Sequence, residues 1–423
     1  NKLTLGTGSK GLTLPNTLTM NNASSSIETK NVNLTLGKAL SLTSGSITST
    51  GGTLSFSSGL TLGAQGTLDV TGSKLSSGGT LDLSSGTFSS DNSSLDLQAA
   101  ITLSANNQVT GQNPVTFEDV HFNGNVLTLG SASTHLKVND ALALSGIPLE
   151  TGAGNLTLSG ALSLSNNAAL NSSGGTITLV SGASASSGTS ISLPDTTLVL
   201  QNALSLAGAT LKTKNTTLTT NDKALSLSSS SILEVDGTQD LSGVSPDNST
   251  TLRLTANSTI DDNATLTVGT LDLANFALTL DNAMAGLSIA QPVTLDASTE
   301  QIITGGADLS LNGGATVNAG TLSSTGGTLS ASSFSVGAAG TVNIQGGTLT
   351  LPAGGTAVTG AAFTTSGTTI SLGGTLEVAN TWTSTNTNLS LTDNASLSST
   401  APLALATLTT NGHDFDLDSV TTD

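Results

Sequence analysis

The chain has 423 residues, of which 36% are hydrophobic, 9% are charged and 2% are aromatic, and its formal net charge is −18. So few charged and aromatic residues are unusual for a globular domain, while the evenly spread apolar residues argue against disorder, which combines low hydrophobicity with high charge. The negative charge argues against binding to nucleic acid or to an anionic membrane, and the absence of cysteine excludes disulfides and thiolate metal sites.

The sequence contains no run of about 18 apolar residues, which a membrane-spanning helix would need. Asn1 leads directly into Leu3, Thr4 and Leu5, without the basic and apolar regions of a signal peptide. We therefore expect no membrane insertion by this segment. We also expect any secretion signal to have been removed or to lie outside the segment.

Apolar and polar residues alternate in short triplets along the chain, such as Leu34-Thr35-Leu36. Each triplet predicts a strand segment with two apolar side chains on one face and a polar side chain on the other. Two triplets separated by three small or polar residues form a nine-residue pattern. The pattern occurs at 12–20, 34–42, 54–62, 75–83, 95–103, 136–144, 156–164, 198–206, 287–295, 309–317, 370–378 and 389–397.

The pattern recurs at intervals of about 20 residues, and sides of six or seven residues then predict a coil with three sides. Stacked coils would bury a continuous apolar core, and roughly 20 coils spaced about 4.8 Å apart would form a rod on the order of 100 Å long. Corresponding positions follow at Leu34, Leu54, Leu75, Leu95, Val115, Leu136, Leu156, Ile177, Leu198 and Leu218, and again at Leu309, Leu329, Leu349, Ile370 and Leu389.

These repeats predict an all-β fold, a single parallel β-solenoid that continues over residues 1–423. The general preference for right-handed parallel connections favours a right-handed β-helix. Spacing is irregular around 236–286, where Pro246 and the pair Asp261-Asp262 lie, so we expect irregular coils or loops there.

Glycine pairs precede several predicted strands in the phrase Gly-Gly-Thr followed by Leu or Ile, as at Gly51-Gly52 and Gly78-Gly79. A tight corner between strands requires a positive φ, which glycine adopts without steric cost. A flexible glycine-serine linker would not carry a phased leucine repeat. The glycine pairs therefore predict the corners of the coil.

The sequence resembles the passenger regions of bacterial secreted β-helix adhesins, meaning autotransporters and filamentous-haemagglutinin-like proteins of two-partner secretion. The resemblance rests on the phrase Thr-Gly-Gly-Thr-Leu at 50–54 and 325–329, the Leu-Thr-Leu triplets, the lack of cysteine and the abundance of Ser, Thr, Asn and Gly. It covers nearly the whole chain and implies an extracellular or cell-surface location. It supplies no catalytic residue.

Acidic residues are the first candidates for chemistry. Asp414, Asp416 and Asp418 alternate and are expected on one side of a strand, either as solvent-facing acids or as ligands of Ca²⁺. No calcium-binding motif accompanies them, so the solvent-facing interpretation is favoured, and no metal or cofactor is predicted. The adjacent pairs Glu118-Asp119 and Asp261-Asp262 are expected in loops.

The histidines and aromatic residues give little sign of catalysis. His121, His135 and His413 are far apart in the sequence, and His121, between Val120 and Phe122, is expected to face outward. Phe56, Phe117, Phe122 and Phe334 fall at inward positions, and the single tryptophan, Trp382, is expected to pack at a corner rather than form an exposed contact.

We therefore expect a protein without enzymatic activity, an extracellular structural or adhesive rod that binds a host or neighbouring-cell surface. One alternative is a subunit that stacks end to end with copies of itself into a filament or coat, because the apolar pattern starts at Leu3 and continues to Leu417 without polar caps. A β-helix enzyme acting on polysaccharide is a minor alternative. Thr-x-Thr does not recur every 20 residues, which argues against an ice-binding face.

Overall fold

A computed structural model describes residues 1–105, 114–130, 132, 134–379, 382–400 and 403–418. The described chain is all-β, without a helix, and its parallel strands stack into a β-solenoid of about 19 turns with about 21 residues in each coil. The predicted fold class is thus confirmed, while the right-handed sense stays a prediction. The described part of the chain contains no helix able to cross a membrane.

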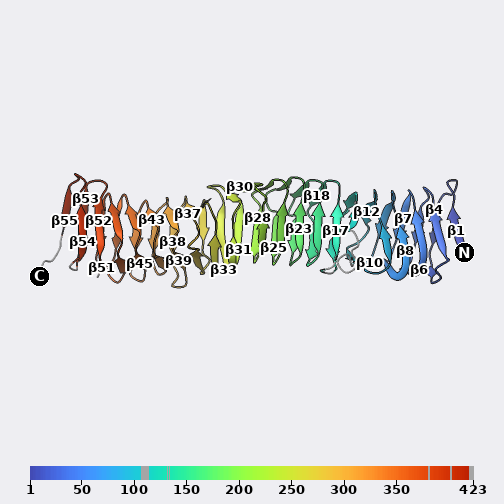
Figure 1. The fold of residues 1–423 in the computed structure, drawn as a ribbon, viewed down its shortest axis with the longest axis horizontal. Helices are drawn as coiled ribbons and strands as arrows, with labels where there is room; N and C mark the ends of the chain where they lie inside the picture. Colours follow the sequence, from blue (N-terminus) through green and yellow to red (C-terminus); the bar gives the residue numbers. More distant parts are fainter. Residues whose placement is uncertain (106–113, 131, 133, 380–381, 401–402, 419–423) are drawn as a thin grey trace. The chain divides into compact units, whose positions relative to one another are not determined.

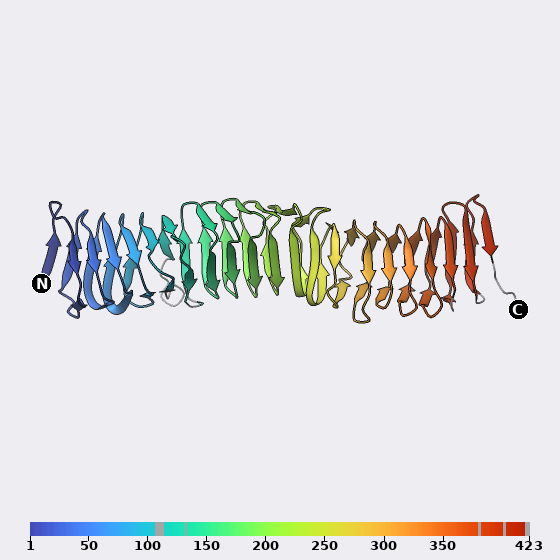
Figure 2. The same ribbon diagram turned by 180° about the vertical axis from the view of Figure 1, so that it is seen from behind.

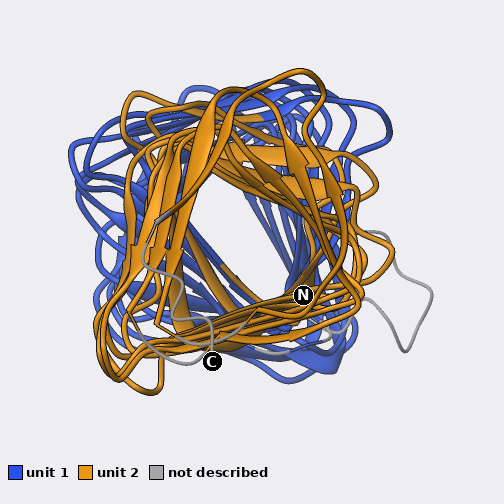
Figure 3. Cartoon of the chain, turned by 90° about the vertical axis from the view of Figure 1, so that its left-hand side faces the viewer, with its two compact units in different colours: residues 1–212, 216–225 blue, residues 213–215, 226–423 orange. Residues whose placement is uncertain are grey.

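The chain divides into two compact units, 1–212 with 216–225, and 213–215 with 226–423, which Figure 3 draws in different colours. Within each unit, strands from successive coils lie side by side (Figures 1 and 2). β28 (Thr210–Lys214) and β30 (Leu225–Ser228) contain residues of both units.

The first unit contains strands of four sheets. One sheet, here called the β2–β15 sheet, consists of β2 (Leu12–Leu14), β5 (Leu34–Leu36), β7 (Thr53–Phe56), β9 (Lys74–Ser77), β12 (Ser94–Leu97) and β15 (Asp119–His121). A second is formed by β14 (Val115–Phe117), β17 (His135–Val138), β20 (Asn155–Leu158), β23 (Thr176–Leu179), β26 (Thr197–Leu200) and β29 (Thr217–Thr219). A third, the β18 sheet, begins with β18 (Leu142–Ser145), β21 (Leu162–Ser165), β24 (Ala183–Ala185) and β27 (Leu204–Ala207).

The remaining strands of the first unit belong to the largest sheet, and two of them are long and bent. These strands are β1 (Lys2–Leu5), β3 (Thr19–Met20), β4 (Ser26–Thr29), β6 (Leu40–Ser49), β8 (Leu60–Asp69), β10 (Leu81–Leu83), β11 (Thr87–Ser89), β13 (Ile101–Ala105), β16 (Leu127–Leu129), β19 (Pro148–Gly152), β22 (Ala169–Ser172) and β25 (Ser190–Pro194). The β6–β8 register shifts between Leu42 and Ser44. Each of these long strands therefore supplies two sides of its coil.

The second unit repeats the three-sided arrangement. One side consists of β34 (Thr265–Val268), β37 (Gly286–Ile289), β40 (Asp308–Leu311), β43 (Thr328–Ala331), β46 (Thr348–Leu351), β49 (Thr369–Leu372), β52 (Thr387–Leu391) and β54 (Leu405–Thr409). The next side consists of β38 (Val293–Leu295), β41 (Ala315–Val317), β44 (Phe334–Val336), β47 (Gly354–Ala357), β50 (Thr375–Val378), β53 (Ala395–Ser399) and β55 (Phe415–Asp418).

The third side of the second unit begins with two long strands. Its strands are β31 (Ile232–Asp240), β33 (Thr251–Asp261), β35 (Thr270–Asp272), β36 (Ala277–Leu280), β39 (Gln301–Thr304), β42 (Thr321–Ser324), β45 (Thr341–Gln345), β48 (Ala362–Ser366) and β51 (Trp382–Thr385). β32 (Val244–Pro246) lies between β31 and β33 along the chain. The stretch 236–286, in which we expected irregular coils or loops, thus contains several strands joined by turns.

Aliphatic side chains of consecutive coils stack over one another in the interior, as predicted. Leu34 pairs with Leu54, Leu54 with Leu75 and Leu75 with Leu95, and all four side chains are fully buried. One coil alone could not bury these side chains, so the stacking supplies the main apolar stabilisation of the fold.

The predicted step from Leu95 to Val115 is wrong. Leu95 pairs with Val120, and Val115 instead pairs with Leu136 in another sheet. The physical reason is a short corner, since only Glu118 and Asp119 separate the triplet that starts at Val115 from the triplet that starts at Val120. The two triplets consequently form different sides of one coil.

The glycine corners follow two different rules. Gly51 and Gly52 have φ values of 109° and 77°, as the sequence predicts. Gly79 lacks a positive φ, but a Cβ there would lie 2.6 Å from the Ser58 carbonyl carbon and oxygen in the preceding coil. That glycine is required because backbones of neighbouring coils approach closely.

Asp262 supports a prediction of pH-dependent stability. Its side chain is buried, and its Oδ1 accepts a hydrogen bond from the Ala264 N–H at 2.9 Å. Burial, together with the nearby Asp240 and Asp261 carboxylates, raises the pKa of Asp262. The folded state therefore keeps this proton to a higher pH than the unfolded chain, and stability falls as the pH rises from about 3.9 through the folded pKa.

We therefore expect Asp262→Asn to cause a small rise in the urea midpoint of unfolding at pH 7 and no rise at pH 3. Asn keeps an oxygen acceptor for Ala264 and removes the charge. Urea titrations at both pH values, followed by circular dichroism, measure the effect. Asp222→Asn, at an exposed turn, is the control. A rise that is equal at the two pH values contradicts the assignment to Asp262 ionisation.

Candidate functional site

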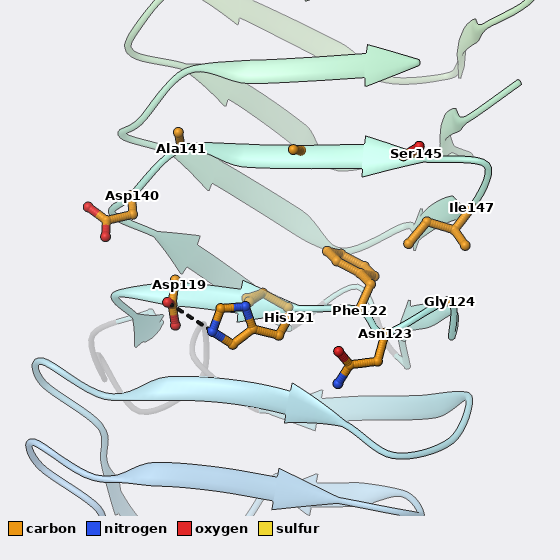
Figure 4. A pocket seen from close by; sticks show the side chains of 11 residues that line it. Asp119, His121, Phe122, Asn123, Gly124, Asp140, Ala141, Ser145 and Ile147 are labelled. Carbon is orange, nitrogen blue, oxygen red and sulfur yellow. Dashed lines mark ion pairs between the residues drawn. The ribbon is translucent and has the colours of Figure 1, made fainter. Parts of the chain in front are cut away.

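The hydrogen-bond ladder of the first unit is interrupted on one side of the coil. The β2–β15 sheet ends at β15, the β18 sheet begins at β18, and no backbone pairing joins these two strands, although they belong to consecutive coils. The other two sides continue across the same coils, through β14 with β17 and β16 with β19. Figure 4 shows a wider gap between the strand of His121 and that of Ala141 and Ser145 than between the strands below it.

Both strands present backbone groups to this gap. Consecutive residues of a parallel strand turn their N–H and C=O groups toward opposite neighbours. The Leu142 N–H donates to the Ala161 carbonyl in the next coil, so Ala143 and Ser145 turn their groups toward β15. Similarly, the Glu118 N–H donates to the Ser93 carbonyl in the preceding coil, so Asp119 and His121 turn theirs toward β18.

A cavity of about 630 Å³ occupies the gap. Val120 and Phe122 are buried on the β15 side, and Figure 4 shows the Phe122 side chain projecting toward the gap. Asp119 and Asp140 line the same end of the cavity (Figure 4). The cavity therefore combines an apolar inner wall with an acidic end.

Asp119 has an incompletely satisfied carboxylate. Its Oδ2 lies 3.1 Å from His121 Nε2, whereas its Oδ1 is buried and has no hydrogen-bond partner among the described residues. A buried carboxylate oxygen without a donor is destabilising, and a bound donor group would relieve that cost. The Asp119 carboxylate is therefore suited to accept a hydrogen bond from a ligand.

Asn123 is held at the other end of the β15 strand. Its Nδ2 donates to Asp96 Oδ1 at 2.7 Å, and Lys74 Nζ lies 3.1 Å from Asp96 Oδ2. Burial of Asp96 opposes its ionisation, but the hydrogen bonds from Asn123 and Lys74 hold its pKa below the usual value. Asp96 is therefore a charged anchor that fixes this rim of the cavity.

The residues singled out in the sequence do not converge on one site. His121 is exposed as expected, and His135 is half-buried, with its Nε2 2.9 Å from Thr157 Oγ1. Burial, with a contribution from Lys137, lowers the pKa of His135. His413 lies just before β55, far along the chain from the other two histidines.

Two of the acidic residues expected in loops belong to strands. Asp119 is the first residue of β15 and Asp261 is the last residue of β33, so the prediction is wrong for both. The short corner after Val115–Phe117 brings Asp119 into the ladder, and the register that pairs Asp261 with Asp240 extends β33. Glu118 and Asp262 lie outside strands, as expected.

Asp414 and Asp416 are exposed, as the favoured interpretation requires, and the side chain of Asp418 lies outside the described residues. Within the described part of the chain, no group of three or more Asp, Glu, His or Cys side chains could hold a metal ion. The four inward phenylalanine predictions are confirmed, because Phe56, Phe117, Phe122 and Phe334 are all buried.

Trp382 packs in the interior, as favoured, at the first residue of β51. Its ring centroid lies 5.4 Å from that of Phe363, and its Nε1–H donates to Thr365 Oγ1 at 2.9 Å. The interior therefore satisfies both the apolar and the polar part of the indole.

Sequence reasoning missed the cavity, although one signal was present. The triplets Val115-Thr116-Phe117 and Val120-His121-Phe122 are separated by two residues, whereas the repeating pattern has three. The spacing from Val120 to Leu142 is again longer than the 20-residue repeat. A local change of spacing marks the coil at which the ladder breaks.

No protein-family model matches the sequence, and no curated protein or solved structure shows a significant match.

Proposed function

We propose that the chain is a structural and adhesive module, displayed on a cell surface or secreted, and that it has no catalytic activity. The observation that carries the proposal is the stacking of about 19 similar coils. Such a stack uses most of its side chains to build a long repeated surface and leaves polar residues at outward positions, as at Thr35 and Ser55. Repeated outward positions suit multivalent, low-specificity contact.

Adhesion can be tested with beads that carry the chain. The chain has no cysteine, so one introduced at an exposed position such as Ser84 gives a single attachment point. We expect several-fold more beads to attach to cell monolayers than beads carrying urea-unfolded chain or an unrelated acidic protein. Equal attachment of all three bead types contradicts an adhesive role. Release of reducing sugar from a panel of polysaccharides would instead support the enzyme.

Exposed leucines favour end-to-end association as a second candidate function. Leu3 in β1 is 43% exposed and Leu417 in β55 is 54% exposed, and each strand has a neighbour on only one side. An unpaired strand edge accepts another strand, either from a second copy or from polypeptide that continues the coil. Sedimentation velocity over a hundredfold concentration range tests this, since a species that remains monomeric throughout contradicts self-assembly of this chain.

A further inference from the structure

We propose that the gap between β15 and β18 binds an extended peptide segment of a partner protein, which inserts as an additional parallel strand and carries a basic side chain at its amino-terminal end. The proposal goes beyond the adhesive role, because it assigns an interaction surface and the chemistry of its partner. It rests only on the first unit.

The first argument is the hydrogen-bonding capacity of the gap. Ala143 and Ser145 on one side and Asp119 and His121 on the other turn backbone N–H and C=O groups toward it, and no backbone pairing joins the two strands. An inserted strand can pair with both edges at once, whereas an ordinary sheet edge offers pairing on one side only. Insertion would join the β2–β15 sheet to the β18 sheet.

The size of the cavity agrees with one short strand. At about 3.3 Å per residue, about 4.8 Å between strands and about 10 Å across a sheet, a strand of four residues occupies roughly 600 Å³. The cavity has a volume of about 630 Å³. β18 itself has four residues, so the two facing edges and the inserted strand would be similar in length.

Side-chain alternation then specifies the peptide. Val120 and Phe122 point inward from β15, and Leu142 and Leu144 point inward from β18. An inserted strand therefore needs apolar residues at two alternate positions, which would continue the interior stack. The residues before and between them would face outward.

Charge selects the first of the outward residues. Asp119 and Asp140 lie at the end of the gap where both strands begin (Figure 4), and Asp119 Oδ1 is buried without a partner among the described residues. A Lys or Arg at the first position of a parallel strand would lie near both carboxylates. The preferred sequence is thus a basic residue, an apolar residue, any residue and an apolar residue.

The test uses the purified full chain and a fluorescein-labelled, end-blocked peptide with the sequence Gly-Lys-Leu-Thr-Leu-Gly. Fluorescence anisotropy should show saturable 1:1 binding, which weakens as NaCl is added. We expect at least tenfold weaker binding when Glu replaces Lys in the peptide, and also when the protein carries Asp119→Asn with Asp140→Asn. Asp222→Asn is the matched charge control, at an exposed turn of the same unit.

A proline pair tests the backbone edge itself. Ala143→Pro removes an N–H that faces the gap, so the protein should keep its circular dichroism spectrum and lose at least tenfold in peptide affinity. Ser163 is the partner of Ala143 in the continuous ladder, so Ser163→Pro should lower the unfolding midpoint instead. Hydrogen exchange adds a readout without mutation, because the Ala143 and Ser145 amides should gain protection when the peptide binds.

Several outcomes would overturn the proposal. These are no saturable binding at millimolar peptide, binding unaffected by Ala143→Pro in a folded protein, and protection of the Ala143 amide by a neutral oligosaccharide but not by the peptide. Each readout uses purified components, so failure here leaves the bead-adhesion result unaffected, and failure of adhesion leaves peptide binding unaffected.

Discussion

Replacing Leu198 by Asp should destabilise the first unit by more than about 4 kcal/mol, whereas Val199→Asp should cost less than about 1 kcal/mol. Leu198 is buried between Ile177 and Leu218 of the neighbouring coils, and Val199 is the next residue on the opposite face of the same strand. A carboxylate at 198 would lie in an apolar stack without a partner, while a carboxylate at 199 would face solvent.

Urea denaturation and hydrogen exchange measure this difference at two scales. The urea midpoint reports the stability of the stack, and exchange resolved to peptides should show loss of protection in the coils that contain Ile177, Leu198 and Leu218. Contacts in a solenoid join neighbouring coils only, so the loss should decline with distance from the substitution. Equal midpoints for the two variants would contradict the inward orientation of Leu198 and with it the stacked core.

Gly354→Ala is the second substitution with a large expected effect, at more than about 3 kcal/mol. Gly354 has a φ of 77°, and a Cβ on it would overlap the backbone of Thr375 in the next coil. The backbone carbonyl of Thr375 is held in the ladder and cannot move aside as a side chain could. The substitution therefore adds a collision between coils to the ordinary strain of a positive φ.

Gly367→Ala separates these two costs. Gly367 has a φ of 61°, but no atom lies within 4 Å of the position that its Cβ would occupy, so the expected loss is about 1 to 2 kcal/mol. Trp382, the only tryptophan, is buried against Phe363 in the same unit, so its emission reports unfolding in urea. If both alanine variants unfold at the same urea concentration, close packing between Gly354 and Thr375 is not what fixes this corner.

The periodic part of the fold was predictable because a period of two and a repeat of about 20 residues are both visible in one sequence. Leu34, Leu54 and Leu75 illustrate this, since each occupies the same position in its triplet and all three stack in the interior. The inward phenylalanines follow from the same alternation. Such predictions use only the direction of a side chain from its strand.

The cavity was not predictable in the same way, because it depends on which coil pairs with which. Val115 satisfies the 20-residue spacing from Leu95, yet the two-residue corner at Glu118 and Asp119 places Val120 opposite Leu95 instead. The candidate peptide site consequently follows from an error in the repeat rather than from a motif. Gly79 gives a similar lesson, since its requirement arises from the backbone of Ser58 in another coil.

The break between β15 and β18 also has a mechanical consequence. When tension acts along the stacking direction, every junction between successive turns bears the same load, and the junction with the fewest cross-links yields first. Two sides of this junction are bonded and the third is not, as the pairing of β14 with β17 and of β16 with β19 shows. A guest segment that filled the third side would reinforce this weak point, so occupancy would set how much pull the first unit resists before it opens.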